Sequence, residues 1–380
     1  MIRFVGVKLL ALVCMCVLIF SCKNEPKHEA TPTGADSDRG IMLTNIADNI
    51  VIPAFASFKL KLENMTAKSD AFRANPTVTT LTDFRTAWGQ AYIEWQKVAV
   101  FDFGPAIDNG LHGFMNIYPT NVTTINANIT SGTASLETIS SYSAQGFPAL
   151  DYLINGSAAT DVDIVALYTT DAEADKRKAY ILQLTNQIKT KFDLVNTAWT
   201  GTYRNTFVAS TGTGLYSSTS LMVNGVVYYY ERYMRSGKFG IPSGIMIGGN
   251  VLPASVEAYY SKEIGKTLAQ TAHQAFINFF NGKGVTTGIK GASLKTYLNA
   301  LGAKDATTQV FLSETINTQF GVVNAKLALL SSEDLSNEIS TNNAAMIAIY
   351  NEMQLAVRML KVDMTSATSI TITYTDNDGD

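Results

Sequence analysis

The stretch KAYILQLTNQIKTKFDLVNTAW at residues 178–199 decides the fold class, because its apolar side chains recur at helical spacing. Successive apolar positions are three or four residues apart, which places them on one face of an α-helix. They are Ile181, Leu184, Ile188, Phe192, Val195 and Trp199. A half-buried strand would instead carry an apolar residue at every second position. The stretch therefore predicts a long amphipathic helix that packs against other helices.

The same helical period extends in both directions from this stretch. Apolar stripes over residues 46–62 and 84–95 lie upstream of it. Downstream, residues 346–360 repeat apolar side chains at a coiled-coil-like spacing. Few segments alternate as strands do, but residues 370–374, where Ile and Tyr alternate with Thr, predict a short terminal strand.

Residues 200–220 interrupt the helical pattern with a stretch rich in Gly, Thr and Ser, which is typical of a boundary between domains. Roughly four helical segments lie on each side of it, as in a pair of antiparallel four-helix bundles. We therefore predict an all-α fold of two tandem antiparallel four-helix-bundle domains, related by an apparent duplication, at residues 40–205 and 206–380. The second domain ends in a short acidic tail.

Composition limits the classes of function that the chain can have. Hydrophobic residues make up 46% of the 380 positions, which is ample for packed cores, and the formal net charge is −3. No run of Lys or Arg longer than KRK at residues 176–178 occurs, although binding to a nucleic-acid backbone depends on clustered positive charge. The sequence therefore predicts no nucleic-acid partner.

The N-terminus carries the features of a bacterial lipoprotein signal. A positively charged segment precedes an apolar run, and the run ends in LIFSC at residues 18–22, which has the pattern of a lipobox. We predict a signal peptide at residues 1–21, a lipid anchor on Cys22 and a flexible tether over residues 22–39. These features place the protein in the bacterial outer membrane, at its periplasmic face or at the cell surface. An uncleaved N-terminal membrane helix is the alternative.

Cysteine usage excludes several chemistries. Cys14 and Cys16 fall within the predicted signal peptide and Cys22 would carry the lipid, so the mature chain would hold no free thiol. Thiol catalysis, zinc–thiolate sites and iron–sulfur clusters are therefore not expected.

Several segments, taken in their order along the chain, resemble the imelysin-like family of peptidases and iron-regulated lipoproteins. They include FRTAW and EWQ at residues 84–96, GFPALDYL at 146–153, and LMVN through GKFGIP at 221–242. The tail at 373–380 is similar to those of lipoprotein members from the Bacteroidetes lineage. The resemblance implies two helical bundles with a conserved site in the cleft where they meet. It also implies a function of one of two kinds, a metallopeptidase or a component of iron uptake.

The signature of the family's peptidase and iron-uptake members, Gly-x-His-x-x-Glu, is altered in this chain. Gly146 matches its glycine, but Pro148 stands at the histidine position and Asp151 at the glutamate position. Pro148 suits the first turn of a helix, and Asp151 would lie one turn inside it, where the helix dipole favours a carboxylate. Either these two residues are structural, or Asp151 is a ligand-binding residue that the resemblance places in the cleft.

Other charged residues in segments that match the family are candidates for the same cleft. Glu94 lies in an aromatic stretch of the first half, and Glu231 and Arg232 follow a run of tyrosines in the second. The predicted ligand-binding cleft thus comprises Gly146, Pro148, Asp151, Glu94, Glu231 and Arg232. The alternative is that the charged side chains form interhelical salt bridges.

Histidines are too few to support a usual catalytic zinc site. The chain has three, His28 in the tether, His112 and His273, whereas such a site usually takes two or three nitrogen ligands. His112 is predicted to lie in a loop beside Asp102 and Asp108, and these three residues are candidates for a metal site. A hydrogen-bonded turn is the alternative for His112. The histidine count therefore disfavours hydrolysis.

These observations lead to one preferred function and two alternatives. We predict a lipid-anchored, non-enzymatic binding protein in iron- or haem-related uptake, whose ligand, iron or an iron chelate, binds between the bundles. Its partners would be the membrane, through Cys22, and an outer-membrane uptake receptor. An imelysin-type metallopeptidase is the first alternative. The second is a surface adhesin or assembly component that uses the acidic tail at 376–380, which resembles the opening of a calcium loop.

Overall fold

The computed structural model describes residues 34–375 of the chain. The predicted signal peptide, the predicted lipidation site Cys22 and the acidic tail at 376–380 lie outside these residues. Helices make up the regular structure of the described part, and its two isolated β-bridges, Lys283 with Lys290 and Lys304 with Phe311, do not extend into strands. The predicted all-α fold is confirmed.

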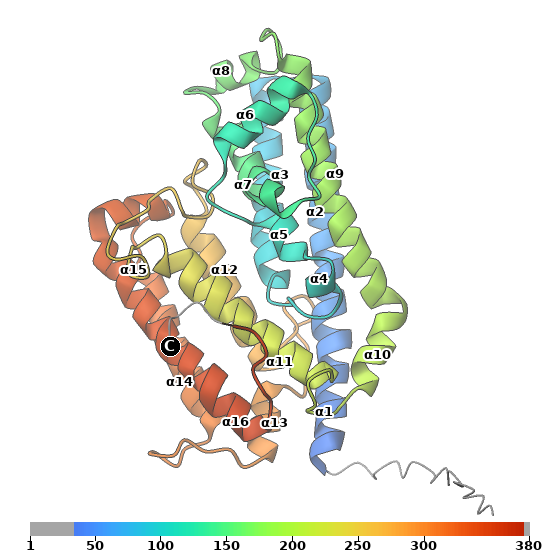
Figure 1. Ribbon diagram of the computed structural model, residues 1–380, viewed down its shortest axis with the longest axis vertical. Coiled ribbons are helices and arrows are strands. Elements are labelled where there is room, and N and C mark those ends of the chain that lie inside the picture. The colour runs from blue at the N-terminus through green and yellow to red at the C-terminus, as the bar shows by residue number, and fades with distance from the viewer. Residues whose placement is uncertain (1–33, 376–380) are drawn as a thin grey trace, which may run out of the picture.

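Three long helical runs form the frame of the first half (Figure 1). The first is continuous through α1 (Gly34–Asn45), η1 (Ile46–Val51) and α2 (Ile52–Ala74), and α3 (Val78–Val98) returns beside it. The third, α9 (Ala174–Ala198), packs along α2. Among the described residues, the run Asp38–Ala74 is long and apolar enough to cross a membrane, but 56% of its apolar window is buried in the fold, as in a core helix.

The core of this half explains the apolar spacing at residues 178–199. All six apolar positions of that stretch are buried, and α9 confirms the predicted helix. Phe192 of α9 lies edge-on against Phe58 of α2, with ring centroids 4.8 Å apart, and Phe55 packs against both Phe192 and Trp199. Edge-to-face aromatic pairs of this kind add about 0.5–1.5 kcal/mol each beyond the burial of their area.

Shorter helices connect α3 to α9 and carry several predicted site residues. They are α4 (Pro105–Asp108), α5 (Leu111–Met115), α6 (Val122–Ser131), η2 (Ile139–Ala144), α7 (Gly146–Asp151), η3 (Tyr152–Gly156) and α8 (Asp161–Ala166). After α9, η4 (Trp199–Tyr203) and α10 (Arg204–Ala209) continue the helical run. The predicted boundary between residues 205 and 206 therefore falls inside α10, and the irregular stretch begins at Ser210.

The second half is also built on long helical runs. They are α11 (Ser218–Tyr228) with η5 (Tyr229–Gly240), α12 (Gly265–Phe280), α14 (Leu312–Ala328), and α15 (Leu335–Arg358) with η6 (Met359–Met364) and α16 (Thr365–Thr368); α13 (Leu294–Ala300) lies between α12 and α14. Helix α12 packs against α3, and buried apolar side chains of both halves form one hydrophobic core. The two halves are therefore joined by shared packing. That they arose by duplication stays a prediction.

Helix α1 begins at Gly34, so residues 34–39 of the predicted flexible tether are helical, and residues 22–33 lie outside the described part of the chain. Arg39 accounts for part of this difference. Its guanidinium group donates to the Tyr297 hydroxyl at 2.8 Å and also to the Thr211 carbonyl, both in the second half. These contacts hold the start of the first helix against the body of the protein.

The short strand predicted at residues 370–374 is wrong. No neighbouring strand exists within residues 34–375, and the segment binds instead to one side chain of α11. Asn224 donates from Nδ2 to the Thr371 carbonyl at 3.0 Å and accepts the Thr373 backbone N–H at 2.8 Å. The alternation of apolar residues with threonine arises because Ile370, Ile372 and Tyr374 pack on the helical core.

Candidate ligand-binding cavity

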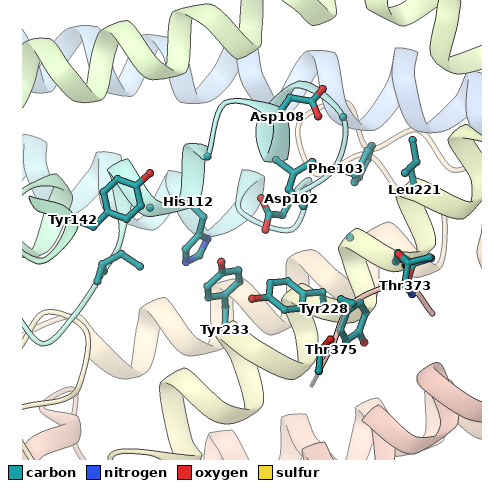
Figure 2. Close-up of a pocket in the computed structure, with 18 of the residues that line it drawn as sticks. Asp102, Phe103, Asp108, His112, Tyr142, Leu221, Tyr228, Tyr233, Thr373 and Thr375 are labelled. Carbon is teal, nitrogen blue, oxygen red and sulfur yellow. Dashed lines mark hydrogen bonds between the residues drawn. The ribbon is translucent and has the colours of Figure 1, made fainter. Parts of the chain in front are cut away.

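A cavity of about 640 Å³ lies between the two halves. Its first-half wall comes from residues 102–113 with Ile117, Tyr142 and Tyr203, and its second-half wall from α11, η5 and residues 373–375 (Figure 2). Small-molecule sites in proteins usually have volumes of this order, about 300–1,000 Å³. The cavity is therefore the candidate ligand site.

Two glycines let the backbone near Asp102 approach its neighbours closely. Gly104 has φ +54°, and a Cβ there would lie 2.0 Å from the Tyr203 hydroxyl oxygen. Gly225 brings α11 against the chain at Asp102, since a Cβ at position 225 would lie 2.4 Å from the Asp102 carbonyl oxygen. The two halves meet at this point, and Asp102 is set in the wall of the cavity.

Asp102 is a buried residue of this wall whose carboxyl group receives no hydrogen bond from the described residues. The residue is 6% exposed, and no hydrogen-bond donor among residues 34–375 reaches its carboxyl group. Burial raises the pKa of Asp102 to about 7, because removal from water disfavours the charged form. In Figure 2 the carboxyl group faces the space between His112 and the tyrosines of the second half.

His112 lies beside Asp102 in the same wall, in helix α5 rather than in the predicted loop. Its ring stacks on Tyr233 of η5, with ring centroids 3.4 Å apart and planes 16° from parallel. Its Nδ1 is buried and has no hydrogen-bond partner within the described chain. Burial, with a smaller contribution from the charge of Lys238, lowers the pKa of His112 to about 3, so the ring is neutral at physiological pH.

Tyrosines form much of the facing wall. Tyr228 lies edge-on to both Tyr233 and Tyr374, at centroid distances of 5.6 and 5.0 Å. The Tyr374 hydroxyl donates to Glu231 Oε2 at 2.9 Å, which holds the segment after α16 against η5. Burial raises the pKa of Tyr203 to about 12 and also raises the pKa of Tyr233, so these phenols stay protonated. The wall thus offers aromatic surface and neutral hydroxyl groups.

A buried polar network near His112 also joins the two halves. Lys238 of η5 forms an ion pair with Glu257, and both side chains are almost fully buried. Gln96 of α3 accepts from Lys238 Nζ at 3.0 Å and donates to Glu257 Oε1 at 3.1 Å. Asn116 donates to the same Glu257 oxygen at 2.6 Å. No local spacing connects residues 96, 238 and 257, so this network has no signal in the sequence and was not predicted.

The predicted cleft residues of α7 line a different and much smaller space. Pro148 is the third residue of α7, in its first turn as predicted. Gly146 has φ +76°, and a Cβ there would lie 2.3 Å from the Met115 carbonyl oxygen, so glycine is required for the close approach. Pro148 and Asp151 border a cavity of about 40 Å³, which has room for little more than water.

Asp151 is buried, and its carboxylate is hydrogen-bonded. It accepts from the backbone N–H groups of Tyr260 and Ser261 at 2.9 and 3.0 Å, and from Asn155 Nδ2 at 2.9 Å. Burial raises the pKa of Asp151 to about 7, although these hydrogen bonds act in the opposite direction. Asp151 thus ties α7 to the chain before α12. Its contact with a ligand stays a prediction.

Glu94 has partners on and beside its own helix. It accepts from the Ser57 hydroxyl of α2 at 2.8 Å and from Lys97 Nζ, one turn later on α3, at 2.7 Å. The ion pair with Lys97 lies within α3, and the contact between helices is the hydrogen bond from Ser57, so the ion pair of Glu94 is not the interhelical salt bridge that the sequence left open.

Glu231 also makes interhelical contacts, and Arg232 lies close to the junction. Glu231 accepts from Lys361 Nζ at 3.1 Å as well as from Tyr374, so it touches the cavity wall through the tyrosine. Arg232 is half-buried, and its charge opposes the burial that raises the pKa of Tyr118. The structure therefore places Glu231 behind the cavity wall.

The three candidates for a metal site line one cavity without forming a set of metal ligands. Asp108 is exposed at the end of α4, whereas Asp102 and His112 are buried. Within residues 34–375, no group of three His, Cys, Asp or Glu side chains could hold a metal ion. His273 lies in the second half, where its ring nitrogens bond to Tyr230 and Asn324 at 3.0 and 3.1 Å.

The fold and the site define an all-helical protein of two joined halves with a small-molecule cavity between them. The chain belongs to the imelysin family, because the family model Imelysin (Peptidase_M75) matches residues 51–363. The family inferred from the sequence is thereby confirmed.

Two solved structures share this fold. An imelysin-like protein from Psychrobacter arcticum 273-4 has a TM-score of 0.67 and 17% sequence identity, over 90% of this chain and 98% of that one. A putative iron-regulated protein A precursor from Parabacteroides distasonis ATCC 8503 has a TM-score of 0.65 and 16% identity, over 88% and 97%. At these identities the likeness establishes the fold alone.

A sequence relative matches over a shorter stretch. Iron-regulated protein A of Synechococcus elongatus is 27% identical over 77 residues, which is 20% of this chain. The match spans about a fifth of that relative's length, 22%.

Proposed function

We propose that the protein is a non-enzymatic, iron-related binding protein whose ligand occupies the cavity between its halves. The observation that carries this proposal is a cavity of about 640 Å³ whose wall holds the buried residues Asp102 and His112, with His112 Nδ1 unpartnered among the described residues. Native proteins rarely leave buried polar groups unpaired. A bound ligand would supply the missing contacts.

An iron chelate suits this cavity better than a bare iron ion. The names of relatives, iron-regulated protein A, support iron as the metal of the ligand. Ferric iron prefers carboxylate and phenolate oxygens as its coordinating atoms. A bare ion would need several ionised ligands close together. In the described lining, however, Asp102 is the buried carboxyl group and the Tyr203 and Tyr233 phenols stay protonated. A chelate brings its own donor atoms and fills the volume.

The two described histidines support binding over peptide hydrolysis. A catalytic zinc takes several nitrogen or carboxylate ligands and keeps one position open. His112 is stacked on Tyr233, and both ring nitrogens of His273 are hydrogen-bonded in the core of the second half. Zinc-dependent cleavage of a peptide that is lost in His112→Ala would replace this proposal with a metallopeptidase.

The proposed location is the outer membrane, with lipid on Cys22 as the anchor and an uptake receptor as the partner that exchanges the ligand. The LIFSC pattern at residues 18–22 supports the anchor. Cys22→Ser should move the protein from the membrane fraction to the soluble fraction of the cell envelope. Retention in the membrane fraction would contradict the lipid anchor.

Isothermal titration calorimetry with ferric citrate, haem and a ferric trihydroxamate tests the proposed site. Leu221 lines the cavity and is 41% exposed, so Leu221→Trp should obstruct it and weaken chelate binding about tenfold or more. Leu329, 72% exposed and outside the lining, provides the matched control Leu329→Trp, which should bind as the wild type does. The proposal fails if no chelate binds, or if Leu221→Trp binds as tightly as the control.

A further inference from the structure

We infer that the cavity selects a chelate that presents a cationic N–H group and discriminates against anionic chelates. This inference rests on the proposed function and narrows it to one chemical class, compact ferric chelates that carry a free ammonium group. Charge, hydrogen bonding and aromatic surface in the cavity lining each point to this class.

The described lining contains carboxyl groups but neither lysine nor arginine. Asp102 lies deep in the wall, and Asp108 is exposed at its edge. An anionic chelate, such as haem with its carboxylates or a ferric catecholate complex, would meet these acids without a counter-charge. A cationic chelate would meet a complementary field.

Lysines close to the lining are bound to carboxylates. Lys238, whose charge acts on His112, is buried in its ion pair with Glu257. Lys361 donates to Glu231 and lies 5.5 Å from the centroid of the Tyr374 ring. The charges of these two lysines are therefore largely neutralised before any ligand binds. Arg232, whose charge acts on Tyr233, is not itself part of the lining.

Asp102 and His112 determine which hydrogen-bonding groups the ligand must carry. An ionised carboxylate only accepts hydrogen bonds, and a neutral imidazole has one acceptor nitrogen. An ammonium group has three donors and no acceptor, so it can satisfy both residues at once. Such charge-assisted hydrogen bonds are stronger than neutral ones, and a cation beside Asp102 also favours its ionised form.

The tyrosine rings suit a cation with hydrocarbon neighbours. Figure 2 shows the rings of Tyr228 and Tyr233 across the space from Asp102. A cation within about 6 Å of such a ring face is attracted by the ring's quadrupole. The hydrocarbon parts of a chelate would pack on the same rings and on Phe103.

The ferric trihydroxamate ferrioxamine B carries a free ammonium group and is the probe for this inference. Its N-acetyl and N-succinyl derivatives keep the same iron centre but have a neutral or an anionic end. By calorimetry, the wild type should bind ferrioxamine B about tenfold or more tightly than the N-acetyl form. It should bind the N-succinyl form most weakly.

Asp102→Asn tests the residue that carries the preference. The variant keeps the shape of the side chain, so it should bind ferrioxamine B about as weakly as the N-acetyl form, while affinity for the N-acetyl form is retained. Glu63→Gln removes an exposed carboxylate outside the lining and should keep the full preference. Thermal denaturation checks the fold of both variants, and the ligand series on the wild type stands independently of them.

Two outcomes would overturn the inference while leaving the proposed function intact. In the first, the three ferrioxamines bind equally or the anionic form binds most tightly. In the second, a folded Asp102→Asn keeps the wild-type preference for the ammonium form. If no chelate binds at all, ferric citrate and haem included, both the inference and the proposed function fail.

Discussion

Asp102 and Asp151 are both buried aspartates at the junction of the two halves, and burial raises the pKa of each to about 7. Their surroundings are nevertheless opposite. Asp151 accepts from two backbone N–H groups and from Asn155, and it borders about 40 Å³ of space. Asp102 meets no donor within residues 34–375 and borders about 640 Å³.

Burial and a shifted pKa therefore do not by themselves identify a ligand site. Structural groups and functional groups both show such shifts. The two aspartates differ in whether their carboxyl oxygens accept hydrogen bonds and in the volume of the cavity beside them. Substitutions of three aspartates, two buried and one exposed, and of one tyrosine in the cavity wall test this distinction.

Removal of the Asp151 carboxylate should give the largest effect. Asp151→Ala leaves the N–H groups of Tyr260 and Ser261 without an acceptor and should lower the free energy of unfolding by about 3 kcal/mol. Urea denaturation at neutral pH measures this change. A loss below about 1 kcal/mol would show that these hydrogen bonds do not hold α7 in place.

Asp102→Asn should act in the opposite direction. The folded pKa of Asp102, about 7, lies above the ordinary value of an aspartate, so the folded protein keeps a proton that the unfolded chain releases. The contribution of Asp102 to the free energy of unfolding is therefore fully present below about pH 4, and it is lost as the pH rises to about 7. The amide avoids this loss, and the variant should gain about 1–3 kcal/mol over the wild type between pH 4 and pH 8.

Groups that face Asp102 do not obscure this measurement. Tyr229 and Tyr233 of η5 stay protonated because burial raises the pKa of each, and burial holds the pKa of His112 at about 3. Asp108, which shares the cavity, is unchanged in the variant. Urea denaturation at both pH values provides the comparison, and an equal difference at both would mean that Asp102 does not titrate in this range.

A smaller effect is expected at the second-half wall. Tyr374→Phe removes the hydrogen bond to Glu231 Oε2 and should cost about 1 kcal/mol of stability. Tyr216→Phe, at an exposed tyrosine outside the lining, is the control and should leave the denaturation midpoint unchanged. If both variants melt alike, the Tyr374 hydroxyl does not stabilise this wall.

An exposed aspartate completes the series with the smallest effect. Asp83 pairs with Lys68 at 2.8 Å on the surface, where solvent screens the charges. Asp83→Asn should change the free energy of unfolding by less than about 0.5 kcal/mol. A change as large as that at Asp151 would show that burial does not determine how strongly these substitutions affect the free energy of unfolding.

The fold could be predicted from the sequence because helical spacing is a local signal. The helical period at residues 178–199 can be recognised from the side chains of that segment alone, and α9 buries the predicted face. The error at residues 370–374 shows the limit of such a signal. Alternation there reflects packing on helices and binding to Asn224, a residue 147 positions earlier than Thr371.

The sequence predicted individual residues of the candidate site but not their arrangement. Asp151 was singled out because it stands at a family signature position, but its backbone donors, Tyr260 and Ser261, lie 109 and 110 residues later. Asp102 was singled out because it is near His112 in the sequence. Its lack of a donor, and the tyrosines of η5 that face it, follow from the meeting of two halves and have no sequence pattern.

The segment that Asn224 holds is the last part of the cavity wall to be synthesised. The cavity walls come from residues 102–142, then from 203–233, and last from 373–375. A chain that emerges N-terminus first can pack α2, α3 and α9 well before Thr373 is available to Asn224. A translation product interrupted before residue 371 would therefore lack this last part of the wall, and the cavity would stay open along that side.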